Sequence, residues 1–159
     1  MRDITIRGVI ERGDGGVATS GGRQLIQIAD GDFTTGYKIK EFRIFAYPDA
    51  ETGHDAYGLV STLPEPKNVV DGGDWDWSDN SQVAWATTSY SGSGATVSEF
   101  TLVDPDNILI ENFYVWMRFG GGGSAINFYL RLEPVEQTEA MAAINMVKQY
   151  SQGGSKRIA

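Results

Sequence analysis

Short stretches in which apolar and polar residues alternate recur along the chain, and a period of two is typical of half-buried β-strands. The clearest is INFYLRLE, residues 126–133, in which every second residue is apolar. YKIKEFRIFAY, residues 37–47, changes phase near Lys40 and Glu41, which predicts a bulge within a long strand. The pattern predicts about eight strands, over residues 4–10, 24–29, 37–47, 56–63, 81–90, 98–103, 108–119 and 126–133.

The segments between these strands are rich in turn-forming residues. GDGGVATSGG (13–22) and SGSGA (91–95) are Gly/Ser turns, and DPDN (104–107) has turn residues at every position. GGGGSA (120–125) separates two strong strand patterns and predicts a hairpin loop. Strands of this length and spacing, with no helices between them, indicate an all-β fold, an antiparallel β-sandwich over residues 4–133.

One helix is expected after the strands, over residues 136–151. TEAMAAINMVKQY (138–150) consists mostly of strong helix formers, and Gly153 and Gly154 end it. Residues 152–159 then form a short basic tail, and the whole chain, 1–159, is expected to be one domain. The apolar side chains of the helix fall on one side, so this face is expected to dock against a sheet edge or a neighbouring subunit: Ala140, Met141, Ile144 and Val147.

Composition narrows the class of protein. The 159 residues include no cysteine, which removes disulfides, thiol catalysis and cysteine-ligated zinc. No apolar run is long enough to cross a bilayer, and the first residues have no apolar region of signal-peptide length, so no membrane-spanning segment is expected. The net charge of −8 argues against a nucleic-acid partner.

The negative charge is concentrated in the middle of the chain. Between Asn68 and Met117 there is no Lys or Arg, whereas eight Asp and Glu residues fall there. Such a region can face a basic partner, bind cations or keep the protein soluble. The sequence leaves these three alternatives open.

The residue patterns of the common enzyme classes are absent, so the chain is predicted not to be an enzyme. His54 is the only histidine, in a Gly/Asp-containing loop typical of surface residues. There is no Gly-x-Ser-x-Gly elbow and no phosphate-binding loop. A carboxylate pair of the glycosidase type stays open, because its members meet in space and not in sequence.

DGGDWDWSDN, residues 71–80, is the candidate binding segment. Trp75 and Trp77 share one side if the segment is extended, and exposed paired rings suit sugar stacking or a protein contact; alternatively both rings pack over the end of the sandwich. Calcium is the one cofactor that the segment suggests, although the spacing of its carboxylates differs from the EF-hand pattern. The four candidate calcium ligands are Asp71, Asp74, Asp76 and Asp79.

With its strand-rich region from 4 to 133 and loops such as GDGGVATSGG and GGGGSA, the chain resembles the small jelly-roll proteins of bacteriophage and other virus particles, in their capsid or decoration components. The resemblance implies a jelly-roll-like sandwich and a structural subunit located in the virion, whose partners are copies of itself and other particle proteins. It carries over no functional residue. The alternative interpretation is a carbohydrate- or calcium-binding β-sandwich module that uses the 71–80 segment.

Overall fold

The computed structural model describes residues 2–28, 35–46, 54–90, 97–121 and 123–153. A short 3-10 turn, η1 (Asp14–Gly16), follows the first strand, and a helix, α1 (Glu139–Gly153), follows the last. The strands in chain order are β1 (Ile4–Glu11), β2 (Gly21–Ile26), β3 (Thr35–Ala46), β4 (His54–Ser61), β5 (Gln82–Tyr90), β6 (Val97–Val103), β7 (Phe113–Gly121) and β8 (Ala125–Glu136).

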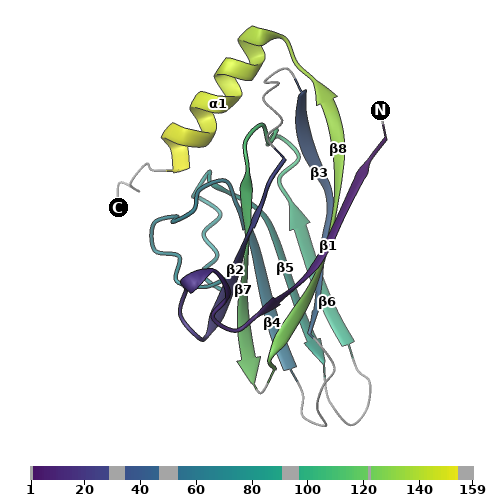
Figure 1. Ribbon diagram of the computed structural model, residues 1–159, viewed down its shortest axis with the longest axis vertical. Coiled ribbons are helices and arrows are strands. Elements are labelled where there is room, and N and C mark those ends of the chain that lie inside the picture. Colours follow the sequence, from purple (N-terminus) through teal and green to yellow (C-terminus); the bar gives the residue numbers. More distant parts are fainter. Residues whose placement is uncertain (1, 29–34, 47–53, 91–96, 122, 154–159) are drawn as a thin grey trace.

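The strands form two antiparallel sheets that pack face to face (Figure 1). One sheet has three strands in the order β1-β8-β3, and the other has five in the order β2-β7-β4-β5-β6. The predicted all-β sandwich with one helix near its C-terminal end is therefore confirmed.

The strand pairs are nested. β1 pairs with β8, β2 with β7 and β4 with β5, as in a long hairpin folded double, which is the arrangement of a jelly-roll-like sandwich. The remaining pair, β3 and β6, lies side by side without a ladder, because β6 pairs with β5 instead. Arg43 of β3 and Glu99 of β6 join the two strands through two hydrogen bonds of 2.9 and 3.1 Å.

The main core lies between the two sheets. Its side chains alternate along each strand, so that Phe42 and Ile44 of β3 and Leu130 and Leu132 of β8 are almost fully buried.

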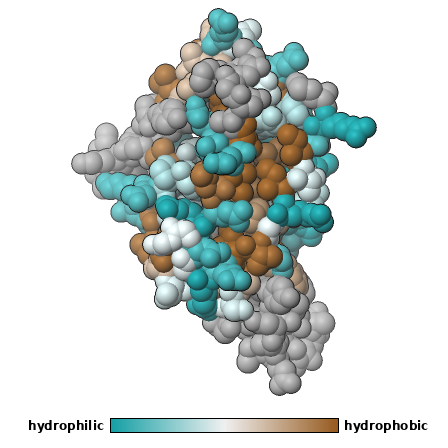
Figure 2. All heavy atoms as spheres, in the orientation of Figure 1, coloured by the Kyte–Doolittle hydropathy of each residue, from teal (hydrophilic) through white to brown (hydrophobic). Residues whose placement is uncertain are grey.

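On the opposite side from β3 and β6, β1 approaches β2 where Ile10 and Glu11 meet Gly22. Apolar atoms gather in the middle of this face between hydrophilic ones (Figure 2), and exposed apolar side chains of these two strands include Ile4, Val9 and Leu25.

Of two local predictions, the structure confirms one and contradicts the other. The bulge is confirmed, because the register of β3 against β8 shifts between Ile39 and Glu41. The hairpin at residues 120–125 is wrong: β7 and β8 belong to different sheets, so this connection crosses between layers. Each strand already has its own antiparallel partners in the nested arrangement, and a Gly-rich stretch serves such a crossing as well as a hairpin.

The end of the sandwich and the start of the helix also shift. β8 continues through Pro134 to Glu136, beyond the expected boundary at 133, and α1 begins at Glu139. β1 begins at Ile4, opposite Leu132, so Pro134 has a strand on only one side, a position where the missing N–H is tolerated. Thr138 caps the helix, because its Oγ1 accepts a hydrogen bond of 3.2 Å from Met141 N.

Candidate functional site

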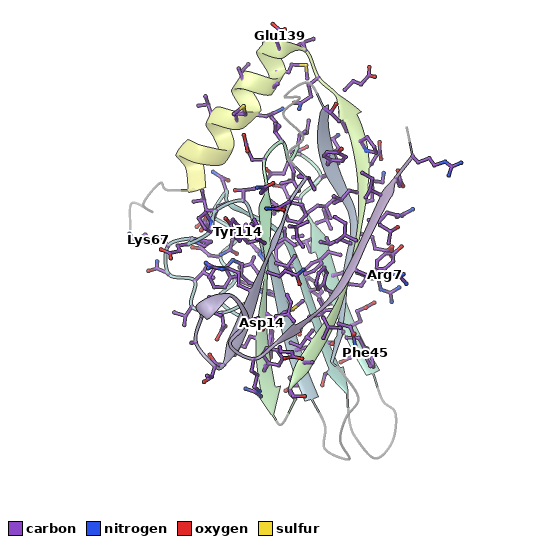
Figure 3. All side chains as sticks on the ribbon, viewed as in Figure 1. Arg7, Asp14, Phe45, Lys67, Tyr114 and Glu139 are labelled. Atoms are coloured by element: carbon purple, nitrogen blue, oxygen red, sulfur yellow. The ribbon has the colours of Figure 1, made fainter. Side chains whose placement is uncertain are left out.

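Residues 62–81, between β4 and β5, cover the outer face of the five-stranded sheet. They carry Trp75 and Val69 onto a small apolar cluster, separate from the main core, whose buried members come from β4, β5 and β7. These buried members are Leu59, Trp85 and Trp116. They form one row across the sheet, because Leu59 pairs with Trp85 on one side and with Trp116 on the other. In Figure 3, Lys67 of this segment lies on the same side of the molecule as Tyr114 of β7. We call residues 62–81 the covering segment.

The covering segment closes on itself and touches the sheet backbone directly. Thr62 N donates a hydrogen bond of 2.9 Å to Ser81 O, so its two ends meet. At Gly72 a Cβ atom would lie 2.5 Å from Trp116 O and 2.7 Å from Met117 Cα. Only glycine permits this approach, and the approach positions Gly72 O to accept a hydrogen bond of 2.8 Å from Trp75 Nε1.

The four predicted carboxylates stabilise turns within this segment. Asp71 Oδ1 accepts from Gly73 N at 2.9 Å, Asp76 Oδ1 from Ser78 N at 3.0 Å and Asp79 Oδ1 from Ser81 N at 2.9 Å. Each is an Asx turn, in which the side chain bonds the backbone two residues on. The fourth, Asp74, accepts through Oδ2 from the backbone N–H groups of Val70 and Asp71 at 2.8 and 3.1 Å.

These carboxylates do not converge in the structure. Within the parts of the chain that the structure describes, no group of three or more Asp, Glu, His or Cys side chains is placed to hold a metal ion. Their oxygens instead meet protein donors, including Ser20 Oγ, which donates to Asp71 Oδ2 at 3.2 Å. Calcium binding at this segment stays a prediction.

Gln82, the first residue of β5, links the covering segment to the sheet. Its Oε1 accepts from Asp76 N at 2.8 Å and from Trp85 Nε1 at 2.9 Å, and its Nε2 donates to Asp74 O at 3.1 Å. The side chain is 2% exposed. The sequence does not single out Gln82, because a polar residue at the start of a strand is ordinary there.

The structure separates the two predicted tryptophans. Trp75 is half-buried, with its ring 6.2 Å from that of Tyr57 and 6.1 Å from that of Phe100 between centroids. Trp77 is 61% exposed, and its ring meets that of Trp85 edge-on, with centroids 6.1 Å apart. Neither ring packs over the end of the sandwich, because both lie against the outer face of a sheet.

Strand β6 adds two more apolar side chains beside them. Phe100 is 44% exposed and Leu102 39%, and they pair across the ladder with Thr87 and Trp85 of β5. Because residues two apart in a strand face the same way, Phe100 and Leu102 share the face that carries the tryptophans. We call this set the aromatic patch: Trp75, Trp77, Phe100 and Leu102.

The middle of the chain acquires positive neighbours that its sequence lacks. Arg43 of β3 pairs with Glu99, and the hydrogen bonds and charge of Glu99 raise the pKa of the Arg43 guanidinium above its ordinary value. Arg118 lies beside Gly73, where a Cβ atom would be 3.0 Å from its Nη1, and Arg23 lies over the ring of Trp116, 5.1 Å from its centroid. The stretch without Lys or Arg is therefore not a uniformly acidic surface.

The outer face of the three-stranded sheet forms an open groove of about 830 Å³. Its central row is Arg7, Tyr129 and Arg43, which face one another across β1, β8 and β3. Phe45 lies further along the groove, and Figure 3 shows it with Arg7 on this side of the molecule. The sequence did not single out this groove, since it depends on which strands are neighbours.

Helix α1 presents three large apolar side chains to the outside. Met141 is 48% exposed, Ile144 60% and Val147 63%, whereas Ala142 on the other side is 2% exposed. Gln137 and Asn145 hydrogen-bond across the first turns. Within the described residues no strand packs closely along the helix, which stands beside one end of the sandwich (Figure 1). The apolar stripe predicted for this helix therefore does not dock on a sheet edge of its own subunit.

His54, the only histidine, is the first residue of β4 and not part of a loop, and its side chain lies outside the described residues. The predicted turn at 91–95 and the tail from 154 onward lie outside them as well. Among the described residues, no helix combines the length and the apolar character needed to cross a bilayer.

Comparisons with protein-family models, with curated proteins and with solved structures find no match for this chain.

Proposed function

We propose that this chain is a non-enzymatic structural subunit of a virus or bacteriophage particle, in the shell or decorating it. It acts through interfaces with copies of itself and with other particle proteins. The nested order of its strands supports the proposal by analogy, because viral capsid domains are often jelly rolls. The observation that carries it is the exposed apolar stripe of α1.

An apolar stripe that is exposed, on a helix with few contacts to the sandwich, is expected to be buried by a partner. A single helix of this length is marginally stable in water, and most helical stability in proteins comes from packing an apolar face. Among the described side chains of α1, the small Ala142 is buried and Met146 is partly buried, whereas the large Met141 and Ile144 face outward. Contact with another subunit would bury them and stabilise the helix.

The stripe suits a second copy of itself. With a two-fold axis through Ile144 and antiparallel helices, Ile144 meets its own copy and Met141 meets Val147, so apolar groups face apolar groups throughout. The neighbouring Ala140 and Ala143 are small enough to let two backbones approach closely. Such an interface is isologous, the type found in two-fold dimers. One pair of short helices buries less than the roughly 800 Å² per partner of a standard interface, so a particle would use further surfaces.

Light scattering coupled to size-exclusion chromatography, over a wide range of concentration, tests the proposal. The wild-type protein is expected to exceed the mass of one chain, and Met141→Gln with Ile144→Gln is expected to shift it to the monomer. Val9→Gln, an equally polar change at an exposed site on β1, is the control and should leave the mass unchanged. A wild-type protein that stays strictly monomeric at high concentration would overturn the proposal.

A further inference from the structure

The aromatic patch is another exposed apolar surface, at the β6 edge of the five-stranded sheet. Three of its four side chains are at least 39% exposed. With about 150–250 Å² for a full aromatic side chain, the exposed area comes to roughly 300 Å². This is well below what each partner contributes to a standard protein interface, and close to the area of one or two sugar rings.

The rings are held in place from behind. The edge-on contact with Trp85 supports Trp77, and Trp85 is itself fixed by its hydrogen bond to Gln82. The indole N–H of Trp75 is bound to Gly72 O, and its ring lies between those of Tyr57 and Phe100. A ligand that stacks here would not have to order the platform first, which reduces the entropic cost of binding.

The surroundings of the patch favour a neutral, hydroxyl-bearing ligand. A sugar ring has an apolar C–H face, which suits the negative face of an aromatic ring, and a polar rim. Ser78 and Asn80 are exposed in the same segment as Trp77 and offer hydroxyl and amide groups for such a rim. Residues 71–80 supply four carboxylates, and the guanidinium of Arg118 lies over the ring of Tyr57 beside them, so a neutral ligand is favoured over an anionic one.

We infer that the aromatic patch binds a neutral oligosaccharide, with sugar rings stacked on Trp77 and on the neighbouring Trp75–Phe100 pair. Binding is independent of calcium, because the carboxylates of the covering segment are already engaged in its turns. The inference does not rest on the proposed assembly role, which concerns a different surface.

Titration of the full chain with cellohexaose, maltohexaose, chitohexaose and mannohexaose, followed by tryptophan fluorescence and calorimetry, tests it. At least one of the four is expected to bind, with the same affinity in calcium and in a chelator. Trp77→Ala is expected to weaken binding roughly tenfold, and Trp77→Phe less, because it keeps a ring. Leu25→Ala, an exposed apolar side chain on β2, is the matched control and should leave binding unchanged.

Three results would overturn the inference: no binding of any of the four sugars, affinity unaffected by Trp77→Ala in a folded variant, or binding of hexalysine in place of sugars. Circular dichroism of each variant reports whether it is folded. The assembly role is tested by the mass measured in light scattering, and sugar binding does not enter that measurement. A failure of this inference can therefore be told apart from a failure of the assembly role.

Discussion

The two outer faces of the sandwich differ in whether another segment covers them. On the five-stranded sheet, Trp85, Trp116 and Leu59 lie under the covering segment and form a second apolar cluster. On the three-stranded sheet, the corresponding positions carry Arg7, Tyr129 and Arg43 and line an open groove. The same alternation along a strand therefore leads to a dry layer on one face and a solvated surface on the other.

The difference lies in what excludes water. Aromatic side chains are stable on an outer face only when something covers them, and the covering segment does so through Trp75, Val69 and the close approach at Gly72. The groove face instead relies on partly exposed ion pairs such as Lys40–Glu133 at 2.9 Å, which contribute little to stability. We therefore expect substitutions on the covered face to affect stability much more than those in the groove.

The sharpest contrast is between two aromatic truncations. Trp85→Ala should lower the free energy of unfolding by about 3–5 kcal/mol, because it empties a site that is 5% exposed. Tyr129→Ala in the groove should cost about 1 kcal/mol or less. Denaturant unfolding of both variants measures the difference, and equal losses would show that the covering segment does not seal its face.

Gly72→Ala tests the close approach of the covering segment to β7. The added Cβ would overlap backbone atoms of Trp116 and Met117, which cannot move easily, so a loss of about 2–3 kcal/mol is expected. Gly8→Ala is the comparison, because its Cβ would overlap side-chain atoms of Phe128, at 2.7 Å, and no backbone atom. Thermal unfolding of the two variants should rank Gly72→Ala as the more destabilised, and the reverse order would contradict the placement of Gly72.

Gln82→Leu tests the polar link between the covering segment and the sheet. The substitution keeps the size of the side chain but leaves Trp85 Nε1 and Asp76 N without their acceptor, which should cost about 1–2 kcal/mol. Hydrogen exchange should then quicken at the Asp76 amide before it does in β5. Gln24→Leu, at an exposed position of β2, should change neither quantity.

The smallest effect is expected in the groove sheet and depends on pH. The hydrogen bond and the charge of Lys40 lower the pKa of Glu133, so the unfolded chain binds this proton more readily than the folded one. The contribution of the pair is therefore present above the ordinary carboxyl pKa of about 4.3 and is lost as the pH falls through the lower folded value. Glu133→Gln should remove this small contribution at neutral pH and change nothing below the folded pKa, so stability should depend less steeply on pH in the acid range. An unchanged acid dependence of stability would contradict this origin.

Local patterns in the sequence predicted the strands better than their partners. The alternation in residues 126–133 identified β8, and the phase slip near Lys40 identified the bulge in β3. The hairpin at 120–125 was wrong because strand partners depend on the whole nested order, which a Gly-rich stretch does not reveal. The limits of α1 were off by a few residues, since Pro134 is tolerated in a strand with a single neighbour.

Only part of the candidate site was predicted, because the sequence does not reveal which strands are neighbours. Trp75 and Trp77 were identified from their own spacing, whereas Phe100 and Leu102 join them only through the pairing of β6 with β5. The acidic middle of the chain was visible in the sequence, but the structure brings Arg43 of β3 to Glu99 and places Arg118 of β7 beside Gly73. The roles of the aspartates in turns also depend on backbone geometry that spacing alone does not fix.

The hydrogen bond from Thr62 to Ser81 has a consequence for how this protein can change over evolution. It closes the covering segment at its base, and β4 and β5 remain direct neighbours beneath it. Residues 63–80 could thus be exchanged for a tight turn without altering the strand order. The bare row of Leu59, Trp85 and Trp116 would then have to become polar in the same step, so the segment and the face beneath it are bound to vary together.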